Sequence, residues 1–424
     1  MKPILKKLPN GLRILLVPMT GNKTVTVMSL VQTGSKYETK KITGLSHFLE
    51  HMMFKGTTKR PTALAITSEL DGLGAECNAF TGQEYTGYYV RGLAEHTEQF
   101  IDVIADIYQN PTFPKAELEK EKGVIVEEIN MYHDMPDEIA DEQLMELMYG
   151  DTPAGWNIAG TTEVVRSMKQ SNFIRYVSDH YTATATTIVI SGGIDTLKTT
   201  NLIKKYFKSI RTTKKHDKKK VVEKQSAPQL SVFKKSTQQT HMIFGFRSID
   251  LSSNQQPALS VLSAILGSGM SSRLFQKLRE EMGVCYYVYS RNQSLTDHGI
   301  FRIGAGVTNA RTTEVVREII NEIKTLLRDG VTADEIIKAK SIIIGRGALG
   351  LESSQSWGMY YGMQAVHDLP LQTRADYEKK INAVTQTDIM TIAKQVFTNN
   401  NLNLSIVGPS VETTKIKTIL KLGE

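Results

Sequence analysis

The order of predicted elements in the first half of the chain recurs in the second half. Each half opens with an alternating strand, Thr24 to Val31 in one and Thr240 to Phe246 in the other. A helix then leads through a glycine into a strand around a cysteine, in the segments GLGAECNAFT and EMGVCYYVYS. Another strand and a long amphipathic helix follow, over His96 to Gln109 and over Thr312 to Leu327. We therefore predict the α+β class, with two homologous domains that are each a mostly antiparallel sheet covered by helices.

A lysine-rich stretch separates the two halves. It includes KKHDKKK and precedes Ser226-Ala227-Pro228, which is the composition of a solvated connector. A chain of 424 residues is also too long for one ordinary hydrophobic core. We predict a first domain over residues 1–213, a linker over 214–225 and a second domain over 226–424.

Composition excludes several classes of function. The net charge of +7 invites a nucleic-acid interpretation, but the lysines concentrate between Lys204 and Lys224, and no zinc-finger or RNA-binding signature accompanies them. No apolar run is long enough to cross a bilayer, and the N-terminal segment indicates a hairpin turned at Asn10-Gly11 rather than a signal peptide. Two cysteines offer no disulfide framework. We predict no nucleic-acid partner, no membrane partner and a cytoplasmic location.

The segment His47-Phe48-Leu49-Glu50-His51 is a metal-binding pattern. Residues four apart share one face of a helix, so His47 and His51 can bind a single ion, and imidazole is a good ligand for zinc. Glu50 can serve as the general base toward water at such a site. A solvated pair of histidines is the alternative, but the neighbouring residues are largely apolar, which favours an enclosed site. Thr43 is the expected cap of this helix, and Gly56 is expected to end it.

A catalytic zinc needs a further protein ligand, and a predicted helix over Lys115 to Tyr132 offers several carboxylates. Glu121 and Glu128 fall on its apolar stripe, two turns apart, whereas Glu127 faces roughly the opposite side. Carboxylates on a buried face need a cation or a donor, so one would bind the metal and the other would support a ligand. Pairing of both with lysines is the alternative, and spacing alone does not decide which one contacts the metal.

Nearly the whole chain resembles the pitrilysin/insulinase family of zinc peptidases with the inverted motif H-x-x-E-H. It is most similar to the short bacterial branch related to the mitochondrial processing peptidases. The segments that carry the resemblance are LPNGLRILLVP, GLSHFLEHMMFKGT, ECNAFTGQEYTGYY, EKEKGVIVEEINMYHDMPDE and GSGMSSRLFQKLREEMGVCYYVYS. The resemblance implies two domains arranged as a clamshell.

The resemblance also implies roles for residues of the first half. His47 and His51 would bind one Zn²⁺ per chain, and Glu50 would act as the base. The family's third ligand is a glutamate about 76 residues beyond the second histidine, which counts to Glu127 or its neighbour Glu128. The helical stripe and the local match favour Glu128, with Glu121 in support.

Two further groups of residues follow from the resemblance alone. Arg279 and Tyr286 match an arginine and a tyrosine of the zinc-free half that contact the bound peptide. An arginine and a phenol are suitable donors to a peptide carbonyl or to a developing oxyanion. The strand that contains Asn78, Ala79 and Phe80 matches the edge on which the family pairs substrate as an added strand.

We therefore predict a zinc metalloendopeptidase that hydrolyses peptides or unfolded, presequence-like segments within a closed chamber, working as a homodimer, with a heterodimer as the alternative. A zinc-binding subunit that needs a partner chain is one competing interpretation. A non-catalytic scaffold of the same fold is the other, but a scaffold does not need a base such as Glu50 between two histidines.

Overall fold

A computed structural model describes residues 1–423 of the chain. These residues divide into two compact units, each with its own sheet and core. The first unit comprises Met1–Asn130, Trp156–Lys219 and Gly350–Thr373, and the second comprises Met131–Gly155, Lys220–Leu349 and the described residues from Arg374 onward. The predicted α+β class with two domains is confirmed. The units differ from the predicted contiguous domains, since each contains one segment from the other half of the sequence.

The first unit is built on a six-stranded sheet in the order β1-β2-β6-β3-β5-β4. All neighbouring strands are antiparallel except β2 and β6, which run parallel. The turn between β1 and β2 contains Gly11 with a φ of 92°, so the predicted hairpin at Asn10-Gly11 is confirmed. The strand bounds are β1 Ile4–Lys7, β2 Arg13–Pro18, β3 Thr24–Val31, β4 Glu76–Thr81, β5 Thr86–Leu93 and β6 Thr186–Gly192.

The second unit is built on a five-stranded sheet in the order β7-β11-β8-β10-β9. Here β11 and β7 run parallel and the other neighbours are antiparallel. The order and directions match those of β2-β6-β3-β5-β4 in the first unit, as an internal duplication requires. The strand bounds are β7 Gln229–Lys234, β8 Gln239–Ser248, β9 Cys285–Ser294, β10 Gly299–Thr308 and β11 Leu402–Gly408.

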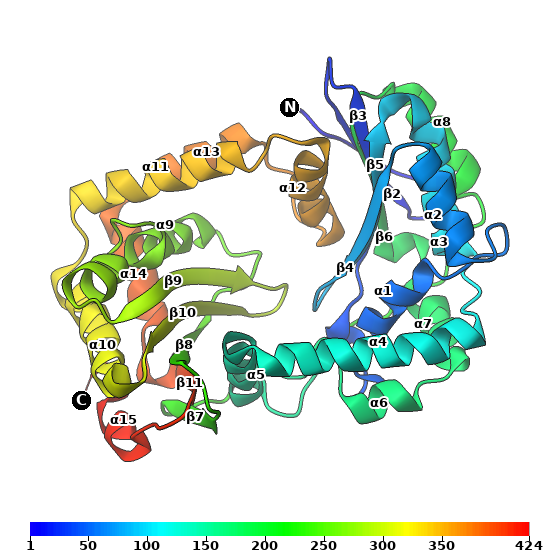
Figure 1. The fold of residues 1–424 in the computed structure, drawn as a ribbon. Helices are drawn as coiled ribbons and strands as arrows, with labels where there is room; N and C mark the ends of the chain where they lie inside the picture. The colour runs from blue at the N-terminus through cyan, green and yellow to red at the C-terminus, as the bar shows by residue number, and fades with distance from the viewer. Residues whose placement is uncertain (424) are drawn as a thin grey trace. The chain divides into compact units, whose positions relative to one another are not determined.

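Helices cover both faces of each sheet, as can be followed within each unit in Figure 1. The helices of the first unit are α1 Leu45–Met53, α2 Ala63–Gly72, α3 Thr97–Gln109, α6 Thr162–Ser167, α7 Gln170–His180, α8 Thr196–Tyr206 and α12 Ser354–Val366. Those of the second are α5 Pro136–Tyr149, α9 Gln256–Gly267, α10 Thr312–Asp329, α11 Ala333–Leu349, α13 Arg374–Ala383, α14 Gln386–Val396 and α15 Thr413–Ile419. Helix α4, Lys115–Asp134, contributes most of its length to the first unit. None of the described helices is both long enough and apolar enough to span a bilayer.

Two helices explain why the compact units exchange segments. Helix α5, from the first half of the sequence, packs on the second sheet, and its Leu144 shares a core with Ile243 and Ile300. Helix α12, from the second half, packs on the first sheet, where Tyr361 shares a core with Leu30. Each sheet therefore buries one face under helices of its own half and the other face under one helix of the opposite half.

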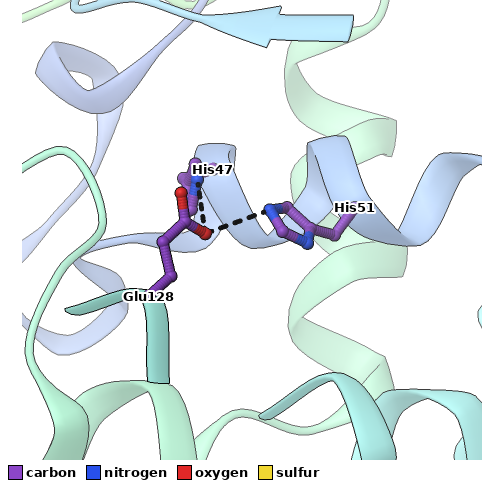
Figure 2. Close-up of side chains that lie close together, drawn as sticks. All are labelled: His47, His51 and Glu128. Atoms are coloured by element: carbon purple, nitrogen blue, oxygen red, sulfur yellow. Dashed lines mark ion pairs between the residues drawn. The ribbon is translucent and has the colours of Figure 1, made fainter. Parts of the chain in front are cut away.

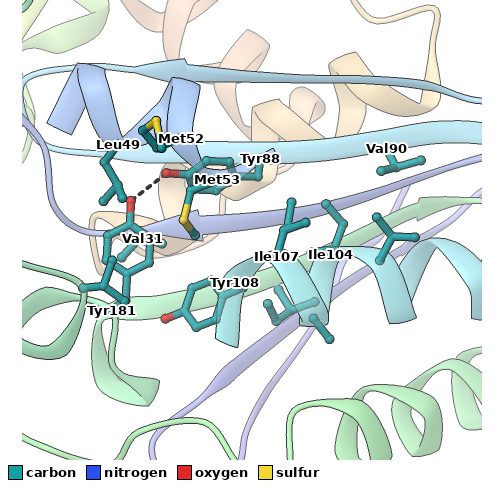
Figure 3. Close-up of a cluster of buried hydrophobic side chains, with 14 of the residues drawn as sticks. Val31, Leu49, Met52, Met53, Tyr88, Val90, Ile104, Ile107, Tyr108 and Tyr181 are labelled. Carbon is teal, nitrogen blue, oxygen red and sulfur yellow. Dashed lines mark hydrogen bonds between the residues drawn. The ribbon is translucent and has the colours of Figure 1, made fainter. Parts of the chain in front are cut away.

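The main core of the first unit lies beneath the helix that carries the H-x-x-E-H motif. Leu49, Met52 and Met53 of α1 are completely buried there, together with residues of β5 and α3 (Figure 3). The polar ends of Tyr88 and Tyr181 meet in this core through a hydrogen bond of 2.8 Å between their hydroxyl oxygens. Close packing on one face of α1 leaves its other face to present the polar residues of the motif.

The lysine-rich segment forms no helix or strand, but the prediction of a solvated connector is wrong for part of it. The side chain of Lys218 is only 11% exposed, and its Nζ lies 3.2 Å from an oxygen of the buried Glu84. Val221 packs against the core beneath α5. A lysine can bury its aliphatic stem when its charged end meets a carboxylate, and composition alone does not show where such a carboxylate lies.

Candidate metal and catalytic site

The start of helix α1 is capped by Glu38, a residue six positions before the N-cap residue Gly44. Its N-cap is Gly44, in the left-handed conformation with a φ of 87°, and no side chain of the N-cap residue caps it, so the prediction of Thr43 is wrong. The carboxyl group of Glu38 accepts hydrogen bonds from the backbone N–H of Gly44 at 2.8 Å and of Ser46 at 2.6 Å. Burial raises the pKa of Glu38 to about 8, against the opposing effect of these hydrogen bonds. Nothing in the local pattern distinguishes Glu38 from a surface glutamate.

Helix α4 lies beside α1 and has the predicted division of its glutamates. Glu121 is buried, Glu128 is partly buried, and Glu127 is exposed, about 100° around the helix from Glu128. The separation follows from the helical period, because residues seven apart return to nearly the same face. Helix α4 therefore presents Glu121 and Glu128 toward α1.

The structure brings His47, His51 and Glu128 together, as Figure 2 shows. Nε2 of His47 and Nε2 of His51 each lie 3.5 Å from the same Glu128 oxygen, Oε2. The two imidazole rings come from one turn of α1, and the carboxylate reaches them from α4. The three side chains are 13–23% exposed, so they are enclosed but accessible.

These three groups fit the requirements of zinc. Two imidazole nitrogens and one carboxylate oxygen are a common donor set for catalytic zinc, which leaves another position for water or substrate. Zinc bonds of about 2.0–2.1 Å in tetrahedral geometry place neighbouring ligand atoms about 3.3–3.5 Å apart. The observed nitrogen–oxygen distances of 3.5 Å agree with that spacing.

Glu121 contacts the ring nitrogen of His51 that does not face Glu128. Its Oε1 lies 2.9 Å from Nδ1 of His51, and its Oε2 lies 2.6 Å from Nζ of Lys55. Burial opposes protonation of His51, but the bond to Glu121 and the nearby carboxylates outweigh it and raise the pKa of His51. Burial likewise disfavours the charged form of Glu121, but the bonds to His51 and Lys55 outweigh it and lower the pKa of Glu121. This contact fits the support that was predicted for Glu121, whereas Nδ1 of His47 has no hydrogen-bond partner among residues 1–423.

Glu50 is partly buried on the same helix as the two histidines. Its Oε2 accepts a hydrogen bond of 2.6 Å from the hydroxyl of Thr81, at the end of β4. No local pattern in the sequence singles out Thr81 for this contact. The alternation of β4 places it on the same face as Ala79 and Cys77, but only the packing of α1 on that face brings it to Glu50.

Strand β4 is the last strand of the first sheet and pairs only with β5 among the described strands. No described strand pairs with its outer edge along Asn78, Ala79 and Phe80, where the backbone N–H of Ala79 donates to Oδ1 of Asn78 at 2.8 Å. Asn78 is exposed, and Phe80 packs in the core beneath α12. An edge of this kind is the structural requirement for adding a strand of peptide.

In the second unit, Arg279 and Tyr286 lie next to each other. Arg279 belongs to a π-helical turn over Phe275–Glu281 that leads into β9. Its guanidinium carbon lies 5.5 Å from the centre of the Tyr286 ring, and its Nη1 donates to the carbonyl of Cys285 at 2.6 Å. Tyr286 is 72% exposed, so the pair is available to another molecule.

Comparison with known proteins identifies the family. The description "Insulinase (Peptidase family M16)" matches residues 13–162, and "Peptidase M16 inactive domain" matches residues 167–343. A Bacillus subtilis protein named as an uncharacterized zinc protease is 36% identical over 403 residues, which cover 95% of this chain and 97% of the relative. A Rickettsia felis protein of the same description is 31% identical over 418 residues, 96% of this chain and 97% of the relative.

Solved structures share the fold. A protease from Helicobacter pylori superposes with a TM-score of 0.88 at 22% identity, covering 96% of this chain and 99% of the other. A Pseudomonas fluorescens protein described as a peptidase M16 inactive domain gives a TM-score of 0.90 at 19% identity, covering 97% and 99%. The resemblance found from the sequence motifs is confirmed: this chain belongs to the insulinase family of peptidases, family M16.

Proposed function

We propose that this protein is a zinc-dependent endopeptidase whose metal ligands are His47, His51 and Glu128. The observation that carries the proposal is the convergence of two imidazole nitrogens on one carboxylate oxygen, each at 3.5 Å. Relatives named as zinc proteases support it. Zinc bound by these residues would act as a Lewis acid, polarising the scissile carbonyl and making water more acidic.

The residues of the chain supply the remaining chemistry. Glu50 would take a proton from the attacking water and pass it to the leaving amine as the peptide bond breaks. Its place one residue before His51 keeps it beside the ligands. The peptide would bind along β4 at Asn78, Ala79 and Phe80, so that main-chain hydrogen bonds hold it with little dependence on its side chains.

We also propose that Arg279 and Tyr286 donate hydrogen bonds to the carbonyl under attack when the two units close over a peptide. The exposure of Tyr286 and its contact with Arg279 support this role. Arg279→Lys should then lower kcat without changing the zinc content. Small-angle scattering with and without peptide should detect the closure, and a molecule of one constant shape would contradict it. The homodimer, the closed chamber, the presequence-like substrates and the cytoplasmic location stay predictions from the sequence.

One experiment tests the function. The purified full chain is analysed for zinc and incubated with a mixed peptide library, whose products are identified by mass spectrometry. We expect about one zinc per chain, and we expect cleavage that a chelator abolishes and added zinc restores. A chain that binds no zinc would indicate a scaffold. Zinc without cleavage would indicate a subunit that needs a partner chain.

A further inference from the structure

The hydroxyl group of Thr81 makes a direct hydrogen bond to the proposed general base. Oγ1 of Thr81 lies 2.6 Å from Oε2 of Glu50, within the range of a charge-assisted bond from a hydroxyl to a carboxylate. Oγ1 of Thr81 also lies 3.4 Å from the backbone carbonyl oxygen of Ser46, in the first turn of α1, the helix that carries Glu50. Thr81 therefore contacts α1 at two points and is the hydrogen-bond partner of Glu50 in the part of the chain that the structure describes.

The position of Thr81 follows from the sheet. Side chains of a strand alternate between its faces, so Cys77, Ala79 and Thr81 share one face of β4. Cys77 and Ala79 pack against the core that contains α1, and Thr81 continues this face at the end of the strand. A threonine has few side-chain rotamers because it is branched at Cβ, which keeps its hydroxyl in place.

The turn after Thr81 is fixed by a buried ion pair. Nζ of Lys36 lies 2.8 Å from Oε1 of Glu84, and the two side chains are 0% and 1% exposed. The backbone N–H of Lys36 also donates to the carbonyl of Gln83 at 2.9 Å. Gly34 approaches so closely that a Cβ there would collide with the carbonyl oxygen of Gly82. The end of β4 is thus attached to the segment that leads into α1.

We propose that Thr81 is a positioning residue that orients the carboxylate of Glu50 for proton transfer. The last torsion of a glutamate is broad, so a carboxylate with no hydrogen bond would sample many orientations. The bond to Oε2 restricts this rotation and leaves Oε1 to accept the proton of the attacking water. This inference rests on the proposed peptidase function, and it assigns to Thr81 a role that concerns the rate of the chemical step.

The test compares Thr81→Val, which removes the hydroxyl at nearly constant volume, with Thr81→Ser, which retains it. Thr86→Val is the matched control, because Thr86 is the residue paired with Thr81 in the ladder and its hydroxyl donates to the carbonyl of Thr33 at 3.0 Å. We expect Thr81→Val to lower kcat on the order of tenfold to a hundredfold, with KM and zinc content unchanged. Thr81→Ser should recover most of the rate, and Thr86→Val should keep the wild-type kcat per zinc-loaded chain.

The outcomes separate this inference from the proposed function. A wild-type chain that binds zinc and cleaves no peptide would overturn both. A wild-type chain that cleaves, together with a wild-type kcat for Thr81→Val, would overturn only the role of Thr81. An equal loss of kcat in Thr81→Val and Thr86→Val would also overturn it, since the effect would then be structural. Thr81→Ala serves as a second hydroxyl-free variant if valine prevents folding, and a wild-type kcat for it would contradict the role equally.

Discussion

Oε1 of Glu121 lies 2.9 Å from Nδ1 of His51, on the side of the imidazole ring away from Glu128. A carboxylate in this place fixes the orientation of the ring and increases the basicity of the opposite nitrogen, Nε2. The other oxygen of Glu121 contacts Lys55, which compensates the charge of a largely buried carboxylate. In the proposed zinc site, Glu121 and Lys55 would thus support His51 without binding the metal themselves.

The first prediction concerns this contact. Glu121→Gln should weaken zinc binding by about tenfold to a hundredfold, because a neutral amide orients the imidazole less strongly and makes it less basic. Competition with a chromogenic chelator measures the affinity. Glu119→Gln is the control, since Glu119 lies on the same helix with a side chain that is 69% exposed and paired with Lys122. Equal zinc affinities for the two variants would rule out the support by Glu121.

The second prediction distinguishes the two adjacent glutamates that spacing alone did not separate. Glu128→Gln should lose most of its bound zinc, because the negatively charged carboxylate that faces both imidazoles becomes a neutral amide, which is a weaker ligand for zinc. Glu127→Gln should retain zinc and activity, since Glu127 is exposed and lies on a different face of α4 from Glu128. Metal analysis after dialysis decides between the two variants. Loss of zinc from Glu127→Gln and not from Glu128→Gln would show that the ligand is Glu127 and that the assignment of Glu128 is wrong.

The third prediction concerns the base. Glu50→Gln should bind zinc like the wild type and lose almost all cleavage, because an amide cannot accept the proton from water. His47→Ala should lose both properties. The pair of variants separates binding from chemistry in one set of measurements, metal content and peptide turnover. Normal turnover by Glu50→Gln would exclude this residue as the base.

Features encoded by local periodicity could be predicted from the sequence. The strand over Thr24–Val31 matches β3 at both ends, and the helix predicted from Lys115 begins at the same residue as α4. The separation of Glu128 from Glu127 also follows from the helical period. These features depend on near neighbours in the chain, where alternation and helical spacing are informative.

Features that depend on distant contacts could not be predicted. Glu38 caps α1 and Thr81 contacts Glu50 only because the chain folds back to bring them there. The positions of α5 and α12 depend on which sheet face remains uncovered, and neither helix carries a local signal of that choice. The burial of Lys218 has the same cause, since its carboxylate partner comes from a remote turn.

The fourth prediction concerns the buried ion pair between Lys36 and Glu84, next to the turn that follows Thr81. Lys36→Met should lower the free energy of unfolding by about 3–5 kcal/mol, because it leaves the carboxylate of Glu84 buried with less compensation. Lys218→Met should cost less, since Lys218 is more exposed and more distant from Glu84. The double variant Lys36→Met with Glu84→Gln should recover part of the loss. Urea unfolding measures the stability of each variant. An unchanged free energy of unfolding for Lys36→Met would contradict a stabilising role of the ion pair.

The last prediction follows from the pKa of Glu38, which burial raises to about 8. In the unfolded chain this carboxyl group ionises near its ordinary pKa of about 4.3, so between these two values the folded protein holds a proton that the unfolded chain has released. The stability from Glu38 is therefore complete below the unfolded pKa. It falls by about 1.4 kcal/mol per pH unit as the pH rises toward the folded pKa.

Urea unfolding of the zinc-free chain between about pH 5 and pH 8 tests this dependence. Glu38→Gln cannot ionise, so the decline of its stability with pH should be shallower than that of the wild type by the contribution of this group. Glu119→Gln, which removes an exposed carboxylate, should keep the wild-type slope. Parallel curves for Glu38→Gln and the wild type would mean that Glu38 is ionised in the fold. The hydrogen bonds from Gly44 and Ser46 would then outweigh its burial, and the charged carboxylate would stabilise the start of α1 through the helix dipole.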